Sequence, residues 1–279
     1  MRLRIDLAYD GTGFSGWAKQ PELPSVQASL ENALARAFRI PESDVRTVVA
    51  GRTDSGVHAT GQVCHVDVAD DFLEELVGED FSALATRRLR GALGKSSSIR
   101  VISVSVAPEG FDARFSPLRR RYEYRIADGL SVKDPRQAGY TLWIDEALDV
   151  ETMNSLGGQL IGLYDFASFC RQREGATTIR TLEQYSWRRD NDGVLIGTVV
   201  ADAFCHSMVR SLVGAAVVVG KGGASVDQII ELRDKTERTS VWKTMAAHAL
   251  TLVEVEYPDV AELAARAEQT RGTRELPSD

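Results

Sequence analysis

The residues best suited to chemistry lie in one short segment, Gly51-Arg-Thr-Asp-Ser-Gly56, which is followed by His58. Asp54 comes after an apolar stretch and is flanked by glycines, a pattern typical of a turn that follows a strand. Because a nearby cation favours the ionised form of a carboxyl group, Arg52 would hold Asp54 as an anion. Such an aspartate can be a nucleophile or a base, or one half of a structural ion pair, and the local residues leave these readings open.

The triplet Asp54-Ser55-Gly56 also matches the D-[ST]-G pattern of aspartic proteases. In those enzymes two aspartates share one proton, so a single copy would require a symmetric dimer. Arg52 favours a fully ionised Asp54 instead. The sequence therefore argues against a protease.

A second glycine-rich segment, Gly11-Thr-Gly-Phe-Ser-Gly16, matches the GxGxxG pattern of dinucleotide sites. In those folds the loop runs directly into a helix that binds the pyrophosphate, whereas here Trp17, Pro21 and Pro24 intervene. We expect either a loop that lines a groove with Phe14 and Trp17, or a tight turn with a buried Trp17.

The histidines do not form a metal-binding pattern, and we expect no metal site. No HExxH motif or other paired spacing relates the four of them: His58, His65, His206 and His248.

Hydrophobic periodicity predicts the elements that carry these residues. Strands are expected at 2–9, 45–50, 63–68, 99–106, 121–127, 179–189, 194–201 and 250–257, and helices at 26–38, 72–93, 151–160, 205–219 and after Ser225. Strands interspersed with helices in both halves indicate an α+β fold. We expect an N-terminal domain over 1–110 that carries the Asp54 loop, a C-terminal domain over 111–258, and a tail over 259–279 that is a loose helix or disordered.

The expected helix at 205–219 is apolar on nearly every face and should be buried. Arg210 lies within it, and a buried arginine requires an anionic partner or a wet cavity. Asp54 is a candidate partner, and such pairing would lower the pKa of its carboxyl group.

Composition limits the class of protein. The chain has 33 Lys and Arg against 40 Asp and Glu, a formal net charge of −7, which weighs against a uniformly basic nucleic-acid binder. Arginine is nevertheless clustered, with five arginines against two acidic residues between 111 and 125. The longest apolar run, 212–220, is too short to span a bilayer, and we see no signal peptide. Three cysteines without a CxxC pair predict no disulfide framework and a reducing, cytoplasmic compartment.

Several motifs, in order along almost the whole chain, closely resemble the TruA-type tRNA pseudouridine synthases. They are Tyr9-Asp-Gly-Thr-Gly-Phe-Ser-Gly-Trp17, Ala50-Gly-Arg-Thr-Asp-Ser-Gly-Val-His-Ala59 with Gly61-Gln-Val63, Phe111-Asp-Ala-Arg-Phe115, Arg120-Arg-Tyr-Glu-Tyr124, Leu163-Tyr-Asp-Phe-Ala-Ser-Phe169, Ala203-Phe204 with Met208-Val-Arg210 and Gly214, and 250–257.

The resemblance implies roles for single residues. Asp54 would be the catalytic aspartate, Arg52 would contact RNA and help to hold the extruded nucleotide, and Tyr122 would stack on the flipped uracil. Arg210 would pair with Asp54, and Leu250 would pack near the base. Further candidates for contact with RNA are Phe14, Trp17, His58, Arg114, Arg119 and Arg121.

The resemblance also implies a fold and an activity. The fold would be two α/β-sandwich-like domains that share a central, mostly antiparallel sheet with helices packed on it. The activity would be isomerisation of uridine to pseudouridine at positions 38, 39 and 40 of the tRNA anticodon stem-loop, by base flipping and without cofactor or metal. The partners would be tRNA and a second copy of the chain, with no membrane. The alternative is a non-catalytic RNA-binding protein on the same fold.

Two segments depart from the family pattern. Tyr164 stands where histidine is usual, and Met245-Ala-Ala-His-Ala249 replaces the common A-P-x-x-G run before Leu250. The second departure affects how the loop near the base is held.

Overall fold

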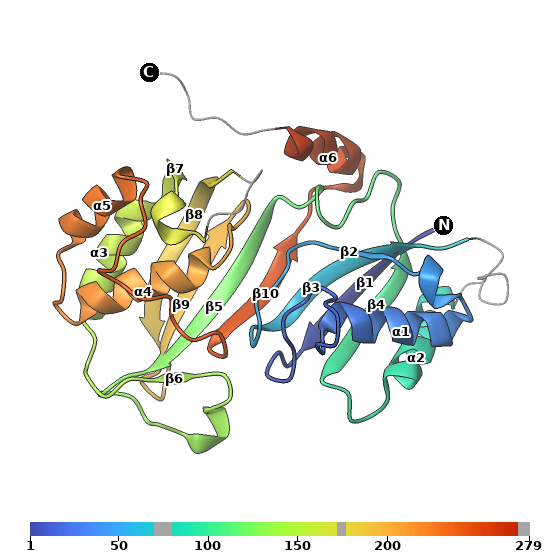
Figure 1. The fold of residues 1–279 in the computed structure, drawn as a ribbon, viewed down its shortest axis with the longest axis horizontal. Helices are drawn as coiled ribbons and strands as arrows, with labels where there is room; N and C mark the ends of the chain where they lie inside the picture. Colours follow the sequence, from blue (N-terminus) through green and yellow to red (C-terminus); the bar gives the residue numbers. More distant parts are fainter. Residues whose placement is uncertain (70–79, 172–176, 273–279) are drawn as a thin grey trace. The chain divides into compact units, whose positions relative to one another are not determined.

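The computed structural model describes residues 1–69, 80–171 and 177–272. These residues form two compact units (Figure 1). Unit 1 comprises Met1–Leu118 and Leu252–Gly272, and unit 2 begins at Arg119 and continues to Thr251. The chain passes from unit 2 back to unit 1 within strand β10 (Leu250–Glu256).

Unit 1 is built on a sheet in which β4, β1, β3 and β10 are neighbours in that order, with β2 paired to β3. The pairings of β1 with β3, β1 with β4 and β2 with β3 are antiparallel. Besides β10, the elements are β1 (Arg2–Tyr9), α1 (Val26–Phe38), η1 (Glu42–Asp44), β2 (Thr47–Val49), β3 (His58–Asp67), α2 (Phe81–Leu93), β4 (Ile99–Val106), η5 (Val260–Glu262) and α6 (Leu263–Arg271).

Local sequence explains these elements. Strand β1 alternates so that Leu3, Ile5 and Leu7 are fully buried, as expected of a strand with one covered face. Helix α1 begins after Ser25, whose side chain accepts a hydrogen bond from the backbone amide of Ala28 and satisfies one of the donors left open at a helix start. The predicted strand at 2–9 and the predicted helix at 26–38 are confirmed.

Unit 2 has the strand order β5, β9, β8, β7, with antiparallel neighbours, and β6 pairs in parallel with β5. Helix α3 packs against β8 and α4. The elements are β5 (Arg119–Ala127), η3 (Pro135–Gln137), β6 (Leu142–Trp143), α3 (Val150–Leu160), β7 (Gly162–Asp165), η4 (Ala167–Phe169), β8 (Ile179–Arg189), β9 (Leu195–Ala201), α4 (Met208–Gly220) and α5 (Val226–Asp234). The predicted α+β class is confirmed.

Strands β8 and β9 form an antiparallel hairpin. Its turn is closed by a hydrogen bond from the amide of Gly193 to the carbonyl of Asp190, and Gly193 has φ of 78°. A residue without Cβ adopts that conformation at little cost.

The boundary between the units differs from the one we predicted at residue 110. Residues 111–118 stay with unit 1 because Phe111 packs on Tyr257 (ring centroids 5.0 Å apart) and the amide of Leu118 donates to the carbonyl of Glu256. Residues 252–272 return to unit 1 rather than ending a C-terminal domain. Within the expected loose tail, 263–271 form α6, in which Leu263 and Ala267 are buried. Periodicity gave no sign of these long-range contacts.

The start of one predicted helix lies outside the described residues, and another helix starts later than expected. Helix α2 begins at Phe81, and the earlier part of the predicted 72–93 helix, through residue 79, lies outside the described residues. Helix α4 begins at Met208 rather than Cys205, because Ser207 has the left-handed φ of 63°. Such a residue interrupts a right-handed helix.

We predicted no disulfide framework, whereas the structure contains one disulfide. A disulfide joins Cys170, at the end of η4, to Cys205, just before α4, with Cα atoms 5.8 Å apart. The two are 35 residues apart in sequence, so only the folded chain brings them together. Cys64 is free and buried, and burial raises the pKa of its thiol.

Within the ranges that the structure describes, no helix combines the length and the apolar character needed to cross a membrane.

Candidate active site

Asp54 lies in the turn that leads into β3. The amide of Val57 donates to the carbonyl of Asp54 over 3.1 Å, and Gly56 has φ of 78°. The Asp54 side chain is half-buried and Arg52 is exposed, while Thr53 between them is buried. The turn therefore presents a carboxylate and a guanidinium to solvent on either side of a residue anchored in the interior.

The glycine segment 11–16 packs against this turn. The amide of Trp17 donates to the carbonyl of Thr53 over 3.1 Å, and the amide of Gly56 donates to the carbonyl of Phe14 over 3.3 Å. A Cβ on Gly11 would lie 2.1 Å from the carbonyl oxygen of Val57, and one on Gly16 would lie 2.9 Å from that of Thr53. The glycines thus allow two backbones to approach closely, which explains a GxGxxG pattern without a nucleotide.

Side chains also join the two segments. The amide of Gly11 donates to Nδ1 of His58 over 3.0 Å, and the same nitrogen lies 3.1 Å from an Asp10 carboxylate oxygen. Hydrogen bonds from the Thr12 hydroxyl and amide lower the pKa of Asp10. The first loop and the Asp54 turn therefore form one continuous structure.

The other predicted site residues of unit 1 differ in exposure. Phe14 is half-buried and Arg114 is exposed, so both can reach a ligand. Trp17 is 1% exposed and packs near Tyr9, with ring centroids 6.1 Å apart. Trp17 therefore packs in the core, as in the second of the two expected arrangements, and its contact with RNA stays a prediction. His58 is also buried, and its Nδ1 accepts the hydrogen bond from the amide of Gly11 in the first loop.

Arg114 is presented by a rigid loop. The carboxylate of Asp112 accepts from the amides of Arg114 and Phe115, and the amide of Ala113 donates to Nδ1 of the buried His65. The guanidinium of Arg114 lies 5.0 Å from the centre of the Phe115 ring.

In unit 2, Tyr122 lies on β5 opposite Val199 of β9. Its ring is mostly buried and meets Phe204 edge to face, with centroids 5.1 Å apart. Phe204 therefore fixes the plane of the Tyr122 ring, as edge-to-face packing does in general.

Arg210 on α4 organises the segment 245–250. Its Nε donates to the carbonyl of Met245 over 2.6 Å, and the amide of Met245 donates back to the carbonyl of Arg210. The hydroxyl of Tyr124 donates to the carbonyl of Ala246, and the amide of Leu250 donates to that of Ala247. These bonds hold the segment before the buried Leu250 although it lacks the family's proline and glycine.

Two candidate arginines of unit 2 are engaged in ion pairs. Arg119 lies 3.0 Å from a Glu183 carboxylate oxygen, and Arg121 lies 3.2 Å from one of Glu123. Both side chains remain partly exposed, so contact with phosphates would have to compete with these carboxylates.

The predicted site residues thus fall into two groups. Asp54, Arg52, His58, Phe14 and Arg114 belong to unit 1. Tyr122, Arg210, Leu250, Arg119 and Arg121 belong to unit 2. The pairing of Asp54 with Arg210 stays a prediction.

Sequence reasoning missed Tyr9, Thr53 and Gln62, whose side chains bond to one another or to the backbone beneath the Asp54 turn. The available signal was weak. It consists of the position of Tyr9 on the apolar face of its strand and of a glutamine directly before the strand expected at 63–68.

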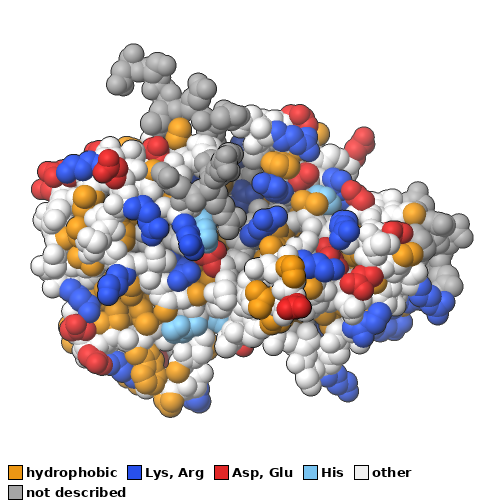
Figure 2. All heavy atoms as spheres, viewed as in Figure 1, with side chains coloured by type: hydrophobic (Ala, Val, Ile, Leu, Met, Phe, Trp, Pro, Cys, Tyr) orange, Lys and Arg blue, Asp and Glu red, His pale blue; other side chains and the backbone are white. Residues whose placement is uncertain are grey.

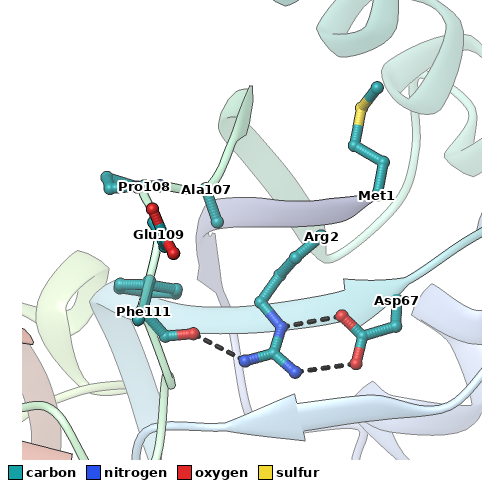
Figure 3. Close-up of a pocket in the computed structure, with 8 residues that line it drawn as sticks. Met1, Arg2, Asp67, Ala107, Pro108, Glu109 and Phe111 are labelled. Carbon is teal, nitrogen blue, oxygen red and sulfur yellow. Dashed lines mark hydrogen bonds and ion pairs between the residues drawn. The ribbon is translucent and has the colours of Figure 1, made fainter. Parts of the chain in front are cut away.

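A pocket of about 380 Å³ elsewhere in unit 1 is distinct from these residues (Figure 3). It is lined by Met1, Arg2, Asp67 and 107–111. The guanidinium of Arg2 there bonds to both carboxylate oxygens of Asp67 and to the carbonyl of Phe111, so each of its three nitrogens already donates a hydrogen bond. Across the described part of the chain, no group of three or more His, Cys, Asp and Glu side chains could hold a metal ion.

Comparison with known proteins identifies the family. The profile of a family described as tRNA pseudouridine synthase matches residues 158–258. A tRNA pseudouridine synthase A of Leifsonia xyli is 53% identical over 99% of this chain and 98% of its own length. Proteins of the same name from Frankia casuarinae (49% identical, 100% of this chain and 97% of theirs) and Mycobacterium leprae (46%, 98% and 96%) are similarly related.

A solved structure of the archaeal box H/ACA sRNP Nop10-Cbf5 complex aligns with 94% of this chain and 54% of its own, at a TM-score of 0.38 and 8% identity. That likeness is too distant to identify a fold. The full-length sequence relationships are sufficient by themselves, and the chain belongs to the tRNA pseudouridine synthase A family.

Proposed function

We propose that this protein isomerises uridine to pseudouridine at positions 38, 39 and 40 of the tRNA anticodon stem-loop, with Asp54 as the catalytic carboxylate. The observation that carries the proposal is the Asp54 turn. Its backbone is anchored by Thr53 and by the glycine loop, while the Asp54 side chain is half-buried and that of Arg52, two residues earlier, is exposed. Membership of the family supports the reaction and the substrate.

The chemistry needs no outside group. The N1–C1′ bond breaks, the uracil rotates, C5 bonds to C1′, and the C5 proton leaves as N1 gains one. An ionised Asp54 can attack C6, attack C1′ or accept the C2′ proton. Flipping the nucleotide out of its stack costs a few kcal/mol, and stacking on Tyr122 would return about 1–3 kcal/mol. Arg52 would hold the extruded nucleotide.

The partner is tRNA, bound by local surfaces rather than by overall charge. Lys and Arg are interspersed with Asp and Glu on the face seen in Figure 2, in keeping with the net charge of −7. Exposed arginines such as Arg52 and Arg114 would contact phosphates, which makes binding dependent on salt. The family resemblance further supports a cytoplasmic location and a homodimer. Light scattering on the purified protein measures the molar mass of the particle, which distinguishes a dimer from a monomer.

The test is tritium release from unmodified tRNA labelled at C5 of uridine. Wild type should release tritium, and Asp54→Asn should release none while binding tRNA within about tenfold of wild type, a loss of no more than about 1.4 kcal/mol. Asp44→Asn is the matched control, since Asp44 is an exposed aspartate of η1 in the same unit, and it should retain full activity.

Two results would contradict this proposal in different ways. Substantial turnover by Asp54→Asn would remove Asp54 from the catalytic role. Tight binding of tRNA by wild type without tritium release, over a full set of tRNAs, would favour the alternative of a non-catalytic RNA-binding protein on the same fold.

A further inference from the structure

A chain of buried hydrogen bonds lies beneath the Asp54 turn. The amide nitrogen of Gln62 donates to the phenol oxygen of Tyr9 over 3.1 Å and to the carbonyl of Gly51 over 2.9 Å. The phenol oxygen in turn lies 2.8 Å from Oγ1 of Thr53. Gln62 is 0% exposed, Tyr9 4% and Thr53 6%.

One bond of this network has a fixed direction. An amide nitrogen can only donate, so the oxygen of Tyr9 accepts from Gln62, while either oxygen can donate in the bond between Tyr9 and Thr53. Burial raises the pKa of Tyr9 to about 12, so the phenol keeps its hydrogen at neutral pH. Breaking one of these hydrogen bonds would leave a buried polar group without a partner, which costs free energy. The hydrogen-bond network therefore keeps its geometry.

This network of hydrogen bonds fixes the backbone on both sides of Arg52. Gln62 holds the carbonyl of Gly51, and Tyr9 holds the side chain of Thr53, the neighbour of Asp54. The amide of Trp17 secures the carbonyl of Thr53 as well. Strands β1 and β3, which carry Tyr9 and Gln62, are paired over most of their length. The rigid sheet therefore supports the segment from which the Asp54 side chain projects.

We propose that Tyr9 is a positioning residue for the reaction, which acts through its hydroxyl on Thr53 to place the Asp54 carboxylate at the uridine. This inference rests on the proposed function. A misplacement of about 1 Å can cost about a hundredfold in rate, so losing the bond should slow the chemical step. A merely structural role would lower stability without slowing that step.

The test is single-turnover tritium release with enzyme saturating, alongside the tRNA dissociation constant and the thermal midpoint. Tyr9→Phe, which keeps the ring, and Thr53→Val should each slow the step at least about tenfold. Thr53→Ser keeps the hydroxyl and should therefore release tritium at about half the wild-type rate or faster, with an unchanged tRNA dissociation constant. Since both residues act through one bond, the double variant should be no slower than the slower single variant.

The matched control removes a buried hydroxyl in the same unit. Oγ1 of Thr86 accepts from the amide of Val104 over 2.8 Å, and Thr86→Val should lower the thermal midpoint without slowing tritium release. A wild-type rate in Tyr9→Phe, or equal slowing in Thr86→Val, would overturn the positioning role. If wild type itself releases no tritium, the proposed function fails first, and the two failures are distinguishable.

Discussion

The backbone amide of Gly11 donates to Nδ1 of His58, so that one hydrogen bond of 3.0 Å ties the first glycine loop to the segment that carries Asp54. The bond requires close backbone approach, since a Cβ on Gly11 would lie 2.1 Å from the carbonyl oxygen of Val57.

Gly11→Ala should therefore push the loop away from the Asp54 turn. We expect tritium release to fall at least about tenfold, because small displacements of a reacting group are costly, together with a lower thermal midpoint. Gly13→Ala in the same loop is the control, since its Cβ would meet nothing within 4 Å. Equal activity in the two variants would mean that the loop and the turn are not coupled.

His65 should make stability depend on pH. Burial lowers the pKa of its imidazole, and Arg2 acts in the same direction, against the opposing charges of Asp112 and Asp67. In the unfolded chain the imidazole of His65 is protonated below about pH 6.5, whereas in the folded chain it stays neutral to a lower pH. His65 contributes its full stability above that pH and loses it as pH falls toward the lowered value.

The measurement is the free energy of unfolding between pH 8 and 5, for wild type and for His65→Asn, which offers an amide oxygen to Ala113 and does not titrate. The difference between them should change below about pH 6.5, with a slope of up to about 1.4 kcal/mol per pH unit against wild type. Parallel curves would show that His65 does not carry this dependence.

Asp128 should be a major determinant of the stability of unit 2. Burial by itself would raise the pKa of its carboxyl group, but hydrogen bonds from Arg189, Leu148, Ser131 and Leu130 together lower it. The side chain is fully buried and its ion pair with Arg189 is 2.7 Å long. Because an amide replaces a carboxylate that accepts several hydrogen bonds, one of them from Arg189, whose side chain is 25% exposed, Asp128→Asn should cost about 1.5–3 kcal/mol of unfolding free energy.

Denaturant unfolding with a far-ultraviolet signal measures this cost. The control is Asp145→Asn, which breaks the 2.7 Å ion pair to Lys133 at an almost fully exposed carboxylate, and it should leave the unfolding midpoint unchanged. Similar midpoints for both variants would refute the distinction between the buried and the exposed pair.

The disulfide predicts a thiol count. Denatured without reductant, the chain should take up one alkyl group, at Cys64, and with reductant it should take up three. Intact-mass spectrometry distinguishes the two results. Three alkyl groups without reductant would show that Cys170 and Cys205 are unlinked in the purified protein.

Much of the local structure could be predicted from patterns along the chain. The alternation of Leu3, Ile5 and Leu7 predicted β1, and the capping serines Ser25 and Ser225 predicted the starts of α1 and α5. These features depend on side-chain period and on hydrogen bonds between residues close in sequence. The short strands β6 and β7 have no such signature, and they form because longer strands lie beside them.

The site was predictable to the extent that its motifs are contiguous. The family, the motif aspartate Asp54 with Arg52, and the expected roles of Tyr122 and Arg210 could be predicted from the sequence, because each prediction depends on a short run of residue types. Tertiary structure alone decided that Trp17 is buried, that Cys170 meets Cys205, and that Tyr9 and Gln62 support Thr53. These relationships join residues tens of positions apart, and the packing that brings them together is set by the whole fold rather than by any local period.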